Sequence, residues 1–537
     1  MRLIRFTVEN HARLADVGLE IRSHLVLVGS NDVGKSSLLR CMDLLLGASA
    51  AALYARVSAD DLRDRSQPLV LEAELDELSP TERAWFVDEP HVEPERGTRT
   101  VTVRMEVLVD DGGTVQIRRF SPHGPGLRQL SRDQIAALGF KLVTATQSAA
   151  RDFRDEKNAA LDDILGAIDL GGEREAFQAA AEGLQRQLGA SAVLRDLRGQ
   201  LAGQLTRAVP RVVGVDDLSF VAGSIASEDL LADVRLQLAR DGEPRPLAEQ
   251  SDGARALFAI ALYDLVSAAA NVVAIDEPEI HLHPSSQRSL ARLLREGPNQ
   301  KILATHSPDV VSAFSPDDIA VVRAGGTIRQ PTRGFLDGEG KLTARWWVQG
   351  KLEPLTAAAV FLVEGPSDRI ILDRVAELTG RDLDRAGVSV VEVDGSRNMA
   401  PARKLFGPAG FDVPLKILID EDAIEETART IGVEPEELPI HGVTVSTPDL
   451  EAEYVKAIGA RTLWGRLKES GEFTANQLAQ VPGGRDGAPT DKAVADFCGT
   501  NRYKVLAALV VASTLTSDEA AKIVSINEVL AGANGLG

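Results

Sequence analysis

Acidic residues follow two aliphatic runs in the second half of the chain, and their type suits divalent-metal chemistry. Glu364 comes directly after the run 360–363. Asp420 and Asp422 follow a second run at 415–419. Because the carboxyl ends of parallel strands meet at one edge of a sheet, these carboxylates are expected to converge there. If the strand geometry persists, Asp420 and Asp422 point to the same side, and their oxygens suit one or two Mg²⁺ or Mn²⁺ ions.

A glycine-bearing loop near the start of the chain has the pattern that binds nucleotide phosphates. Residues 29–36 read G-S-N-D-V-G-K-S, which satisfies G-x-x-x-x-G-K-[ST] between an aliphatic run and a helical pattern. Backbone N–H groups of such a loop surround the phosphates, Lys35 reaches the β- and γ-phosphates, and the Ser36 hydroxyl binds Mg²⁺. The residues expected to contact ATP in this part of the chain are Gly29, Asn31, Gly34, Lys35, Ser36 and Ser37.

Two further aliphatic runs end in residues that suit the hydrolysis of a bound nucleotide. The run 272–275 leads to Asp276 and Glu277, and the run 302–304 leads to Thr305 and His306. Asp276 is expected to hold Mg²⁺ through water, and Glu277 is expected to polarise the attacking water as a general base. A lone histidine such as His306 is more often structural. A functional role for it is therefore inferred only because the other nucleotide-binding segments are also present.

Taken together, these segments resemble the ABC-type ATPases, in the branch that contains structural-maintenance, RecF-like and OLD (overcoming lysogenization defect) proteins. The resemblance implies that His306 senses the γ-phosphate and that a signature motif precedes Asp276. Ser251 and Gly253 occupy that position, but they depart from the familiar L-S-G-G-Q and the glutamine is missing. Because the signature helix of this family acts on the ATP of a partner subunit, the resemblance also implies a head-to-head homodimer.

The order strand–Glu–Gly and then strand–Asp-x-Asp resembles the Toprim domain of topoisomerases, primases and OLD nucleases. The resemblance implies that Glu364 lies nearest the chemistry and that Asp420 and Asp422 are metal ligands in a two-metal mechanism. Asp368 matches a second acidic metal position of the OLD proteins, although that family often has glutamate there. The alternative, in which such strand-terminal carboxylates are helix caps or surface groups, stays open.

The Toprim resemblance further implies one more acidic element after the sheet and a lysine near the phosphate. Glu451 and Glu453 both fit the acidic element, and Glu451 is favoured as a metal ligand. Lys504 is a candidate for the lysine that stabilises the transition-state phosphate, with Lys492 as an equal alternative.

These residues predict two α/β domains followed by a helical C-terminal region. An ABC-type P-loop ATPase domain is expected at 1–345, a Toprim α/β domain at 355–460 and a helical C-terminal region at 461–537. Within the first domain, about 155–207 predicts an α-helical insertion, because apolar residues recur three and four apart. It is either a dimerisation element or a helical layer over the sheet. The segment 79–98, rich in Pro, Glu and Arg, predicts an exposed loop.

The composition limits the class of protein. A net charge of −20 argues against a protein that coats nucleic acid through bulk positive potential, although metal ions can supply local positive charge. The two cysteines, Cys41 and Cys498, lack metal-ligand spacing and do not form a disulfide framework. No signal peptide or membrane span is visible, so a cytoplasmic protein without a membrane partner is expected.

The leading hypothesis is an ATP-regulated, divalent-metal-dependent DNA endonuclease that uses ATP and Mg²⁺ or Mn²⁺ in phage defence or DNA processing. The implied partners are DNA, further copies of the chain as a homodimer or higher oligomer, and a helicase-like protein of the kind found in Gabija-type systems. The main alternative is a RecF-like, ATP-switched DNA-binding or sensor protein with a non-cleaving Toprim fold. A topoisomerase or primase is disfavoured, because Tyr454 and Tyr503 are isolated and no priming domain is visible.

Overall fold

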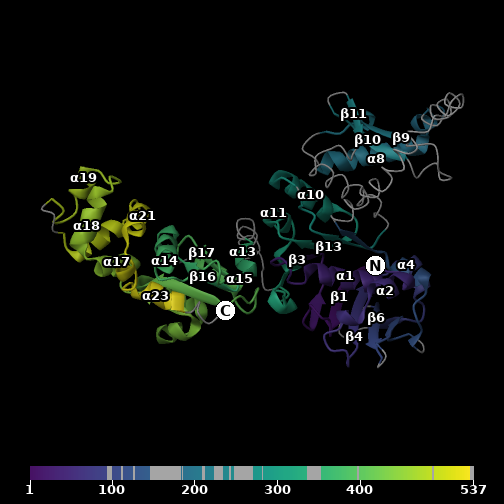
Figure 1. The fold of residues 1–537 in the computed structure, drawn as a ribbon, viewed down its shortest axis with the longest axis horizontal. Helices are drawn as coiled ribbons and strands as arrows, with labels where there is room; N and C mark the ends of the chain where they lie inside the picture. The colour runs from purple at the N-terminus through teal and green to yellow at the C-terminus, as the bar shows by residue number, and fades with distance from the viewer. Residues whose placement is uncertain are drawn as a thin grey trace. The chain divides into compact units, whose positions relative to one another are not determined.

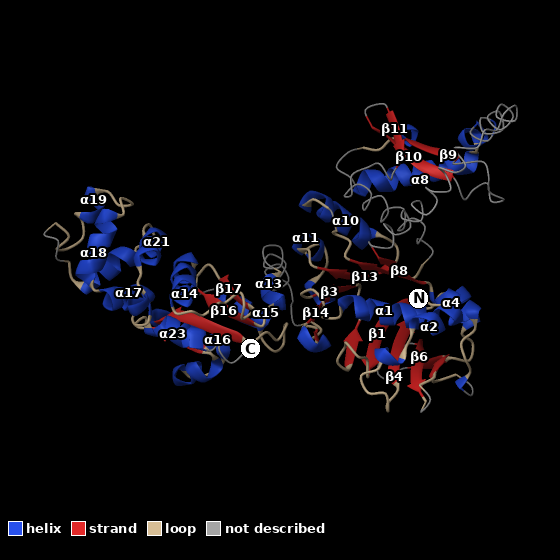
Figure 2. Cartoon of the chain, in the orientation of Figure 1, coloured by secondary structure: helices blue, strands red, loops and turns tan. Residues whose placement is uncertain are grey.

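The structure is a computed structural model that divides into two compact units. The first unit consists of Met1–Gln330 with Val348–Gly350, and the second consists of Pro331–Trp347 with Lys351–Gly537. The residues that the structure describes are 1–92, 99–110, 113–124, 127–144, 183, 186–208, 212–222, 234–240, 243–246, 270–280, 282–334, 352–395, 398–485 and 489–531. Each unit combines strands and helices (Figures 1 and 2).

The first unit contains an antiparallel sheet that the amino-terminal strand enters at once. Its strand order is β2-β1-β4-β6-β5, with β7 also paired to β6. Buried and exposed residues alternate along much of β1, as expected for a strand with one face in the core. The strands of this sheet are β1 (Arg2–Glu9), β2 (Val17–Glu20), β4 (Leu69–Asp76), β5 (Pro90–Val92), β6 (Arg99–Val109) and β7 (Val115–Phe120).

A second sheet in the same unit is mostly parallel and carries the nucleotide motifs. Its order is β15-β14-β3-β13-β12-β8, and its inner strands are buried along almost their whole length, which is typical of parallel strands covered on both faces. Helix α1 (Lys35–Leu46) contacts strands of both sheets and shares one apolar core with them. The strands are β3 (Leu25–Val28), β8 (Phe140–Thr144), β12 (Val272–Asp276), β13 (Gln300–Thr305), β14 (Ile319–Val322) and β15 (Ile328–Arg329).

Helices and a small third sheet complete the described part of this unit. Strands β9, β10 and β11 form an antiparallel sheet, and the Arg198 guanidinium of α8 donates to the carbonyl oxygen of Leu218 at 3.2 Å. The part of the expected helical insertion from 192 onward is helical, whereas 145–182 lies outside the described residues. The bounds are β9 (Leu218–Ala222), β10 (Val234–Arg240), β11 (Glu243–Pro246), α2 (Ala50–Arg56), α3 (Pro80–Trp85), α4 (Arg132–Leu138), α8 (Ala192–Ala208), α10 (Pro284–Glu296) and α11 (Pro308–Val311).

The second unit is built on a four-stranded parallel sheet of order β17-β16-β18-β19. Its strands are β16 (Ala359–Val363), β17 (Val388–Glu392), β18 (Leu415–Asp420) and β19 (Val443–Ser446). Helices α14 (Pro366–Leu378), α15 (Met399–Phe406) and α16 (Ile424–Ile431) follow strands of this sheet, as in other α/β folds. The two strands that carry the candidate acids, β16 and β18, are direct neighbours.

The described residues beyond 450 are mostly helical, as the sequence predicts. These helices share one apolar core with the sheet, and α21 packs against α14 (Figure 1). They are α17 (Leu450–Ile458), α18 (Ala460–Glu469), α19 (Ala475–Leu478), α20 (Asp491–Gly499), α21 (Lys504–Thr514), α22 (Ser517–Ala520) and α23 (Val524–Ala531). Within the described residues of the whole chain, no helix has both the length and the apolar character needed to cross a bilayer.

The segment expected to be an exposed loop is partly regular, which corrects that prediction. Residues 80–85 form α3 and residues 90–92 form β5. The Ser79 side chain accepts from the backbone N–H of Glu82, and the Glu82 carboxylate accepts from the N–H of Ser79. This capping box begins a helix although the surrounding composition favours a loop.

Candidate nucleotide and metal sites

The phosphate-binding loop has the backbone geometry that its sequence requires. Gly34 has φ of 112°, a left-handed value that favours glycine, and α1 begins at the next residue. A Cβ on Gly29 would clash with the carbonyl oxygen of Val322, so this position also needs glycine. The ammonium of Lys35 donates to the carbonyl oxygens of Gly29 at 3.0 Å and Ser30 at 2.8 Å. The lysine side chain thus lies across the loop that is expected to hold phosphates.

The other nucleotide motifs reach the same edge of the parallel sheet. Strand β13 pairs with both β3 and β12, so the three carboxyl ends are adjacent. The Nε2 atom of His306 lies 3.0 Å from the ammonium of Lys35 and 3.4 Å from a carboxylate oxygen of Glu277. The backbone N–H of His306 donates to the Glu279 carboxylate at 2.5 Å. The sequence indicated the histidine, but it gave no indication that Glu279 fixes its main chain.

Asp276 has the properties expected of a cation-binding carboxylate. Burial raises its pKa, whereas a hydrogen bond from the Ser36 hydroxyl and the charge of Lys35 lower it. Its Oδ1 atom is buried and has no hydrogen-bond partner among the described residues. A buried carboxylate oxygen without a partner is costly unless a cation or water satisfies it, so the donors present fit a Mg²⁺ ion.

Of the remaining residues expected to contact ATP, the structure describes two and leaves two undescribed. Asn31 is exposed on the loop and Ser37 is partly buried on α1, so both lie in the phosphate-binding segment. Ser251 and Gly253, the expected signature residues, lie outside the described residues.

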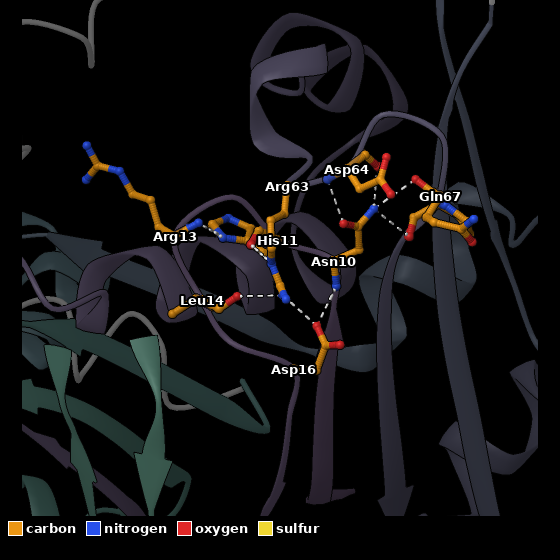
Figure 3. Close-up of polar contacts among 9 residues, drawn as sticks. Asn10, His11, Arg13, Leu14, Asp16, Arg63, Asp64 and Gln67 are labelled. Carbon is orange, nitrogen blue, oxygen red and sulfur yellow. Dashed lines mark hydrogen bonds and ion pairs between the residues drawn. The ribbon is translucent and has the colours of Figure 1, made fainter. Parts of the chain in front are cut away.

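A cavity of about 480 Å³, which no sequence motif indicated, lies beside the phosphate-binding loop. Arg63 holds one wall in place, because its guanidinium donates to the carbonyl oxygen of Leu14 at 3.1 Å and to the Asp16 carboxylate at 2.6 Å (Figure 3). The backbone N–H of Asn10 donates to the same carboxylate at 2.9 Å. The residues that line the cavity are Ala12, Arg13, Leu14, Ala15, Asp32, Val33, Arg63, Gly325 and Gly326.

In the second unit, two strand ends and the start of a helix bring candidate acids together. Glu364 follows β16, and Asp420 ends the neighbouring strand β18. The backbone N–H of Asp420 donates to a carboxylate oxygen of Glu364 at 3.4 Å. The backbone N–H of Leu450, the first residue of α17, donates to the Asp420 carboxylate at 3.1 Å. The convergence that the sequence predicted for Glu364 and Asp420 is therefore present.

A lysine from the helical region reaches the same place. The ammonium of Lys504 lies 3.5 Å from a carboxylate oxygen of Glu451 and 3.9 Å from one of Asp420. Burial alone lowers the pKa of Lys504, but the neighbouring carboxylates, led by Glu451, raise it above its ordinary value. Of the two lysines suggested by the sequence, Lys504 lies among these carboxylates, whereas Lys492 is exposed on α20.

The carboxylates around Lys504 form what we call the acidic site, which consists of Glu364, Asp368, Asp420 and Glu451. Burial raises the pKa of each of them, and it raises that of Asp420 to about 8. The negative charge of Asp368 also raises the pKa values of the other three acids, while Lys504 lowers the pKa of all four. Four buried carboxylates beside one ammonium are therefore costly to ionise together, and an added cation would lower that cost.

Within the acidic site, Asp368 is buried at the start of α14. It accepts from the backbone N–H of Gly365 at 2.9 Å and from the hydroxyl of Ser367 at 3.3 Å. The donor type suits Mg²⁺ or Mn²⁺, because these ions prefer carboxylate oxygens. As the side chains stand, no three acidic, histidine or cysteine residues in the described part of the chain are grouped so as to hold one ion.

Comparison with known proteins fits this geometry. Residues 355–422 match the family described as "Overcoming lysogenization defect protein-like, TOPRIM domain". Residues 116–312 match the family described as "AAA domain, putative AbiEii toxin, Type IV TA system". The chain carries a P-loop ATPase domain followed by an OLD-like TOPRIM domain.

Relatives extend this similarity over both units. The chain is 22% identical over 424 residues to endonuclease GajA of Bacillus cereus, covering 74% of this chain and 71% of that protein. It is 24% identical over 461 residues to the OLD nuclease of Thermus scotoductus, covering 80% of this chain and 84% of that protein. The solved C-terminal region of the Burkholderia pseudomallei OLD protein aligns with 34% of this chain and 99% of its own, at 24% identity and a TM-score of 0.28.

Two acids suggested by the sequence, Asp422 and Glu453, lie outside the acidic site. Strand β18 of the TOPRIM domain ends at Asp420, and a 3₁₀ turn follows over Glu421–Ala423. The strand alternation that was expected to place Asp422 beside Asp420 therefore does not continue. Asp422 is exposed, although its charge still raises the pKa of Glu364. Glu453 contacts other parts of the chain instead of Lys504.

Proposed function

We propose that the chain is a DNA endonuclease that depends on divalent metal ions and is governed by ATP. The observation that carries this proposal is the convergence of the acidic site with Lys504 at the carboxyl edge of the TOPRIM sheet. Similarity to two nucleases, endonuclease GajA and OLD nuclease, supports the same reaction class. The fold alone would not be sufficient support, since one fold hosts many functions.

Each residue of the acidic site has a distinct part in the proposed reaction. Glu364, Asp368, Asp420 and Glu451 would hold Mg²⁺ or Mn²⁺, and exposed Asp422 remains a further proposed ligand. A bound ion supplies charge neutralisation at the scissile phosphate and a more acidic water. Lys504 can place its ammonium against a phosphate oxygen, because it already lies among the ligands. This ammonium would stabilise the negative charge that develops as the bond breaks.

The nucleotide site would regulate this activity. In the proposal Lys35 leaves its contacts with the loop carbonyls to bind phosphates, Asp276 and Ser36 hold Mg²⁺, and Glu277 activates water. His306 would sense the γ-phosphate from its place beside Lys35. The nucleoside part of ATP is proposed to occupy the cavity beside the loop. The head-to-head homodimer, the helicase-like partner, the cytoplasmic location and the role in phage defence stay predictions from the sequence.

A cleavage assay on the full chain tests the proposal. Supercoiled plasmid is incubated with the protein and Mg²⁺ or Mn²⁺, and nicked and linear products are measured. We expect cleavage by the wild type and by Glu426→Gln, an exposed acid of α16 that serves as a matched control. Glu364→Ala should abolish cleavage, whereas Lys35→Ala should abolish ATP hydrolysis and retain some cleavage.

A second candidate is an ATP-switched DNA-binding or sensor protein in which the TOPRIM domain does not cleave. Two observations favour it: Lys504 already pairs with Asp420 and Glu451, and the described side chains do not form a three-ligand group as they stand. ATP hydrolysis and DNA binding without cleavage under either metal would support the sensor and contradict the nuclease.

A further inference from the structure

A hydrogen-bonded carboxylate lies on the side of α17 away from Lys504. One oxygen of Glu453 accepts from the backbone N–H of Thr447 at 3.3 Å. Its other oxygen accepts from the backbone N–H of Ser525 at 3.0 Å and from the Ser525 hydroxyl at 2.9 Å. The hydroxyl of Ser446 in turn donates to that of Ser525 at 2.9 Å. Glu453 thus fastens the end of β19 to the start of α23.

The segment that Glu453 holds also contacts the acidic site directly. Thr447 begins the connection from β19 to α17, and the carbonyl oxygen of Pro448 accepts from the backbone N–H of Glu421 at 3.1 Å. At the end of the connection, the backbone N–H of Leu450 donates to the Asp420 carboxylate at 3.1 Å. Residues 447–450 therefore contact the Glu453 carboxylate on one side and Asp420, at the end of β18, on the other.

The helix geometry extends this link to a second acid. Residues two apart on an α-helix face nearly opposite ways, because each residue turns the helix by about 100°. Glu451 accordingly faces Lys504 while Glu453 faces Ser525. Fixing Glu453 therefore fixes the rotation of the first turn of α17 about its axis, and with it the direction of Glu451.

We propose that Glu453 is a positioning residue, which holds residues 447–450 and thereby sets Asp420 and Glu451 for metal binding. The inference rests on the proposed function, because it assumes that the acidic site takes a divalent ion. Outer partners that orient ligands of a metal typically change its affinity by about 10- to 100-fold when they are lost. Glu453 therefore contributes to the metal affinity of the acidic site, although it lies outside that site.

The substitution Glu453→Gln tests this with little change in shape. A carboxylate offers only acceptors, and all three groups directed at Glu453 are donors. The NH₂ group of a glutamine would face at least one of these donors. The hydrogen bonds to Thr447 and Ser525 should therefore weaken, and no cavity forms because glutamine has nearly the same size. Ser525→Ala removes the hydroxyl donor alone and should have a smaller effect in the same direction. Glu469→Gln, at an exposed position in the last turn of α18, is the matched control.

The measurement is the affinity of the full chain for Mn²⁺ without nucleotide, by electron paramagnetic resonance of free Mn²⁺. We expect the Kd to rise at least about 10-fold in Glu453→Gln, with less change in Ser525→Ala and none in Glu469→Gln. ATP hydrolysis should stay at the wild-type level, and raised Mn²⁺ should restore cleavage. If Glu453→Gln fails to fold, the Ser525→Ala result decides.

The outcomes separate the two proposals. A wild type that binds no Mn²⁺ outside the nucleotide site and cuts no DNA contradicts the proposed function itself. A wild type that binds Mn²⁺ and cleaves, with both Glu453→Gln and Ser525→Ala binding equally well, overturns the positioning role alone. A loss of cleavage in Glu453→Gln that raised Mn²⁺ does not restore also overturns it.

Discussion

Replacing Lys504 with methionine should separate metal binding from bond cleavage. The change keeps an unbranched side chain of similar length and removes the positive charge. The lysine ammonium lies 3.5 Å from Glu451 and 3.9 Å from Asp420, so it competes with a divalent ion for the same two carboxylates. We therefore expect Lys504→Met to bind Mn²⁺ at least as tightly as the wild type while it cleaves DNA far more slowly.

The size of the effect follows from the geometry. At an effective dielectric constant of about 20, a pair of unit charges 3.5–3.9 Å apart has a direct attraction of roughly 4–5 kcal/mol before desolvation is subtracted. Water screens part of this attraction, because 25% of the Lys504 side chain is exposed. Removing one preorganised charge from a transition state typically slows a reaction by about 10² to 10³. We expect the cleavage rate of Lys504→Met to fall within that range.

The assay is single-turnover nicking of supercoiled plasmid at saturating Mn²⁺, with Mn²⁺ affinity measured on the same preparations. Lys492→Met is the matched control, because Lys492 is exposed on α20 and makes none of these contacts. Cleavage by Lys504→Met at the wild-type rate would contradict this role of the ammonium. So would a loss of cleavage that merely follows a loss of Mn²⁺ binding, since Lys504 would then act only as a structural partner of the acids.

Two predictions concern the stability of the ATPase unit. His24 accepts from the backbone N–H of Lys301 at 3.1 Å through Nδ1, and burial lowers its pKa to about 4. The folded state therefore favours neutral His24, so its stabilising contribution is complete above pH ~6.5 and is lost as the pH falls toward about 4. His24→Asn should flatten the pH dependence of the unfolding midpoint over that window, and an unchanged profile would contradict this. Buried Arg119 donates to carbonyl oxygens of Leu44 at 3.2 Å, Leu45 at 3.3 Å and Ala48 at 2.7 Å at the end of α1. Arg119→Met should lower the free energy of unfolding by about 2–4 kcal/mol in urea titrations, and a loss below about 0.5 kcal/mol would contradict the role.

Much of both sites follows from local sequence, because their residues come at the ends of strands with clear aliphatic runs. The phosphate-binding loop, Asp276 and His306 all come at or directly after the carboxyl end of a parallel strand, and adjacency of the strands then brings them together. The same reasoning places Glu364 beside Asp420. The aliphatic runs and the residues that follow them are sufficient to predict these positions, because the carboxyl ends of neighbouring parallel strands lie at one edge of the sheet.

The parts that sequence reasoning left open depend on long-range packing or on a change of backbone. Lys504 reaches the acidic site because α21 packs against α14, and neither helix carries a local signal for that contact. Asp422 leaves the strand alternation because a 3₁₀ turn begins directly after Asp420. The cavity beside the phosphate-binding loop is built from separate segments around Arg13, Arg63 and Gly326, which no single motif joins. The spacing of Glu451 and Glu453 places them on opposite sides of a helix, but only the folded contacts show which of the two faces Lys504.

Whether metal acts at the acidic site is tested most directly by Mn²⁺ binding and plasmid nicking in Lys35→Ala and in the double variant Lys35→Ala/Glu364→Ala, since Lys35→Ala removes the contribution of nucleotide. We expect the Lys35→Ala parent to bind Mn²⁺ and nick plasmid, and the double variant to do neither while it stays folded. If Glu364→Ala binds and nicks as its parent does, the carboxyl edge of the TOPRIM sheet is not where the metal acts.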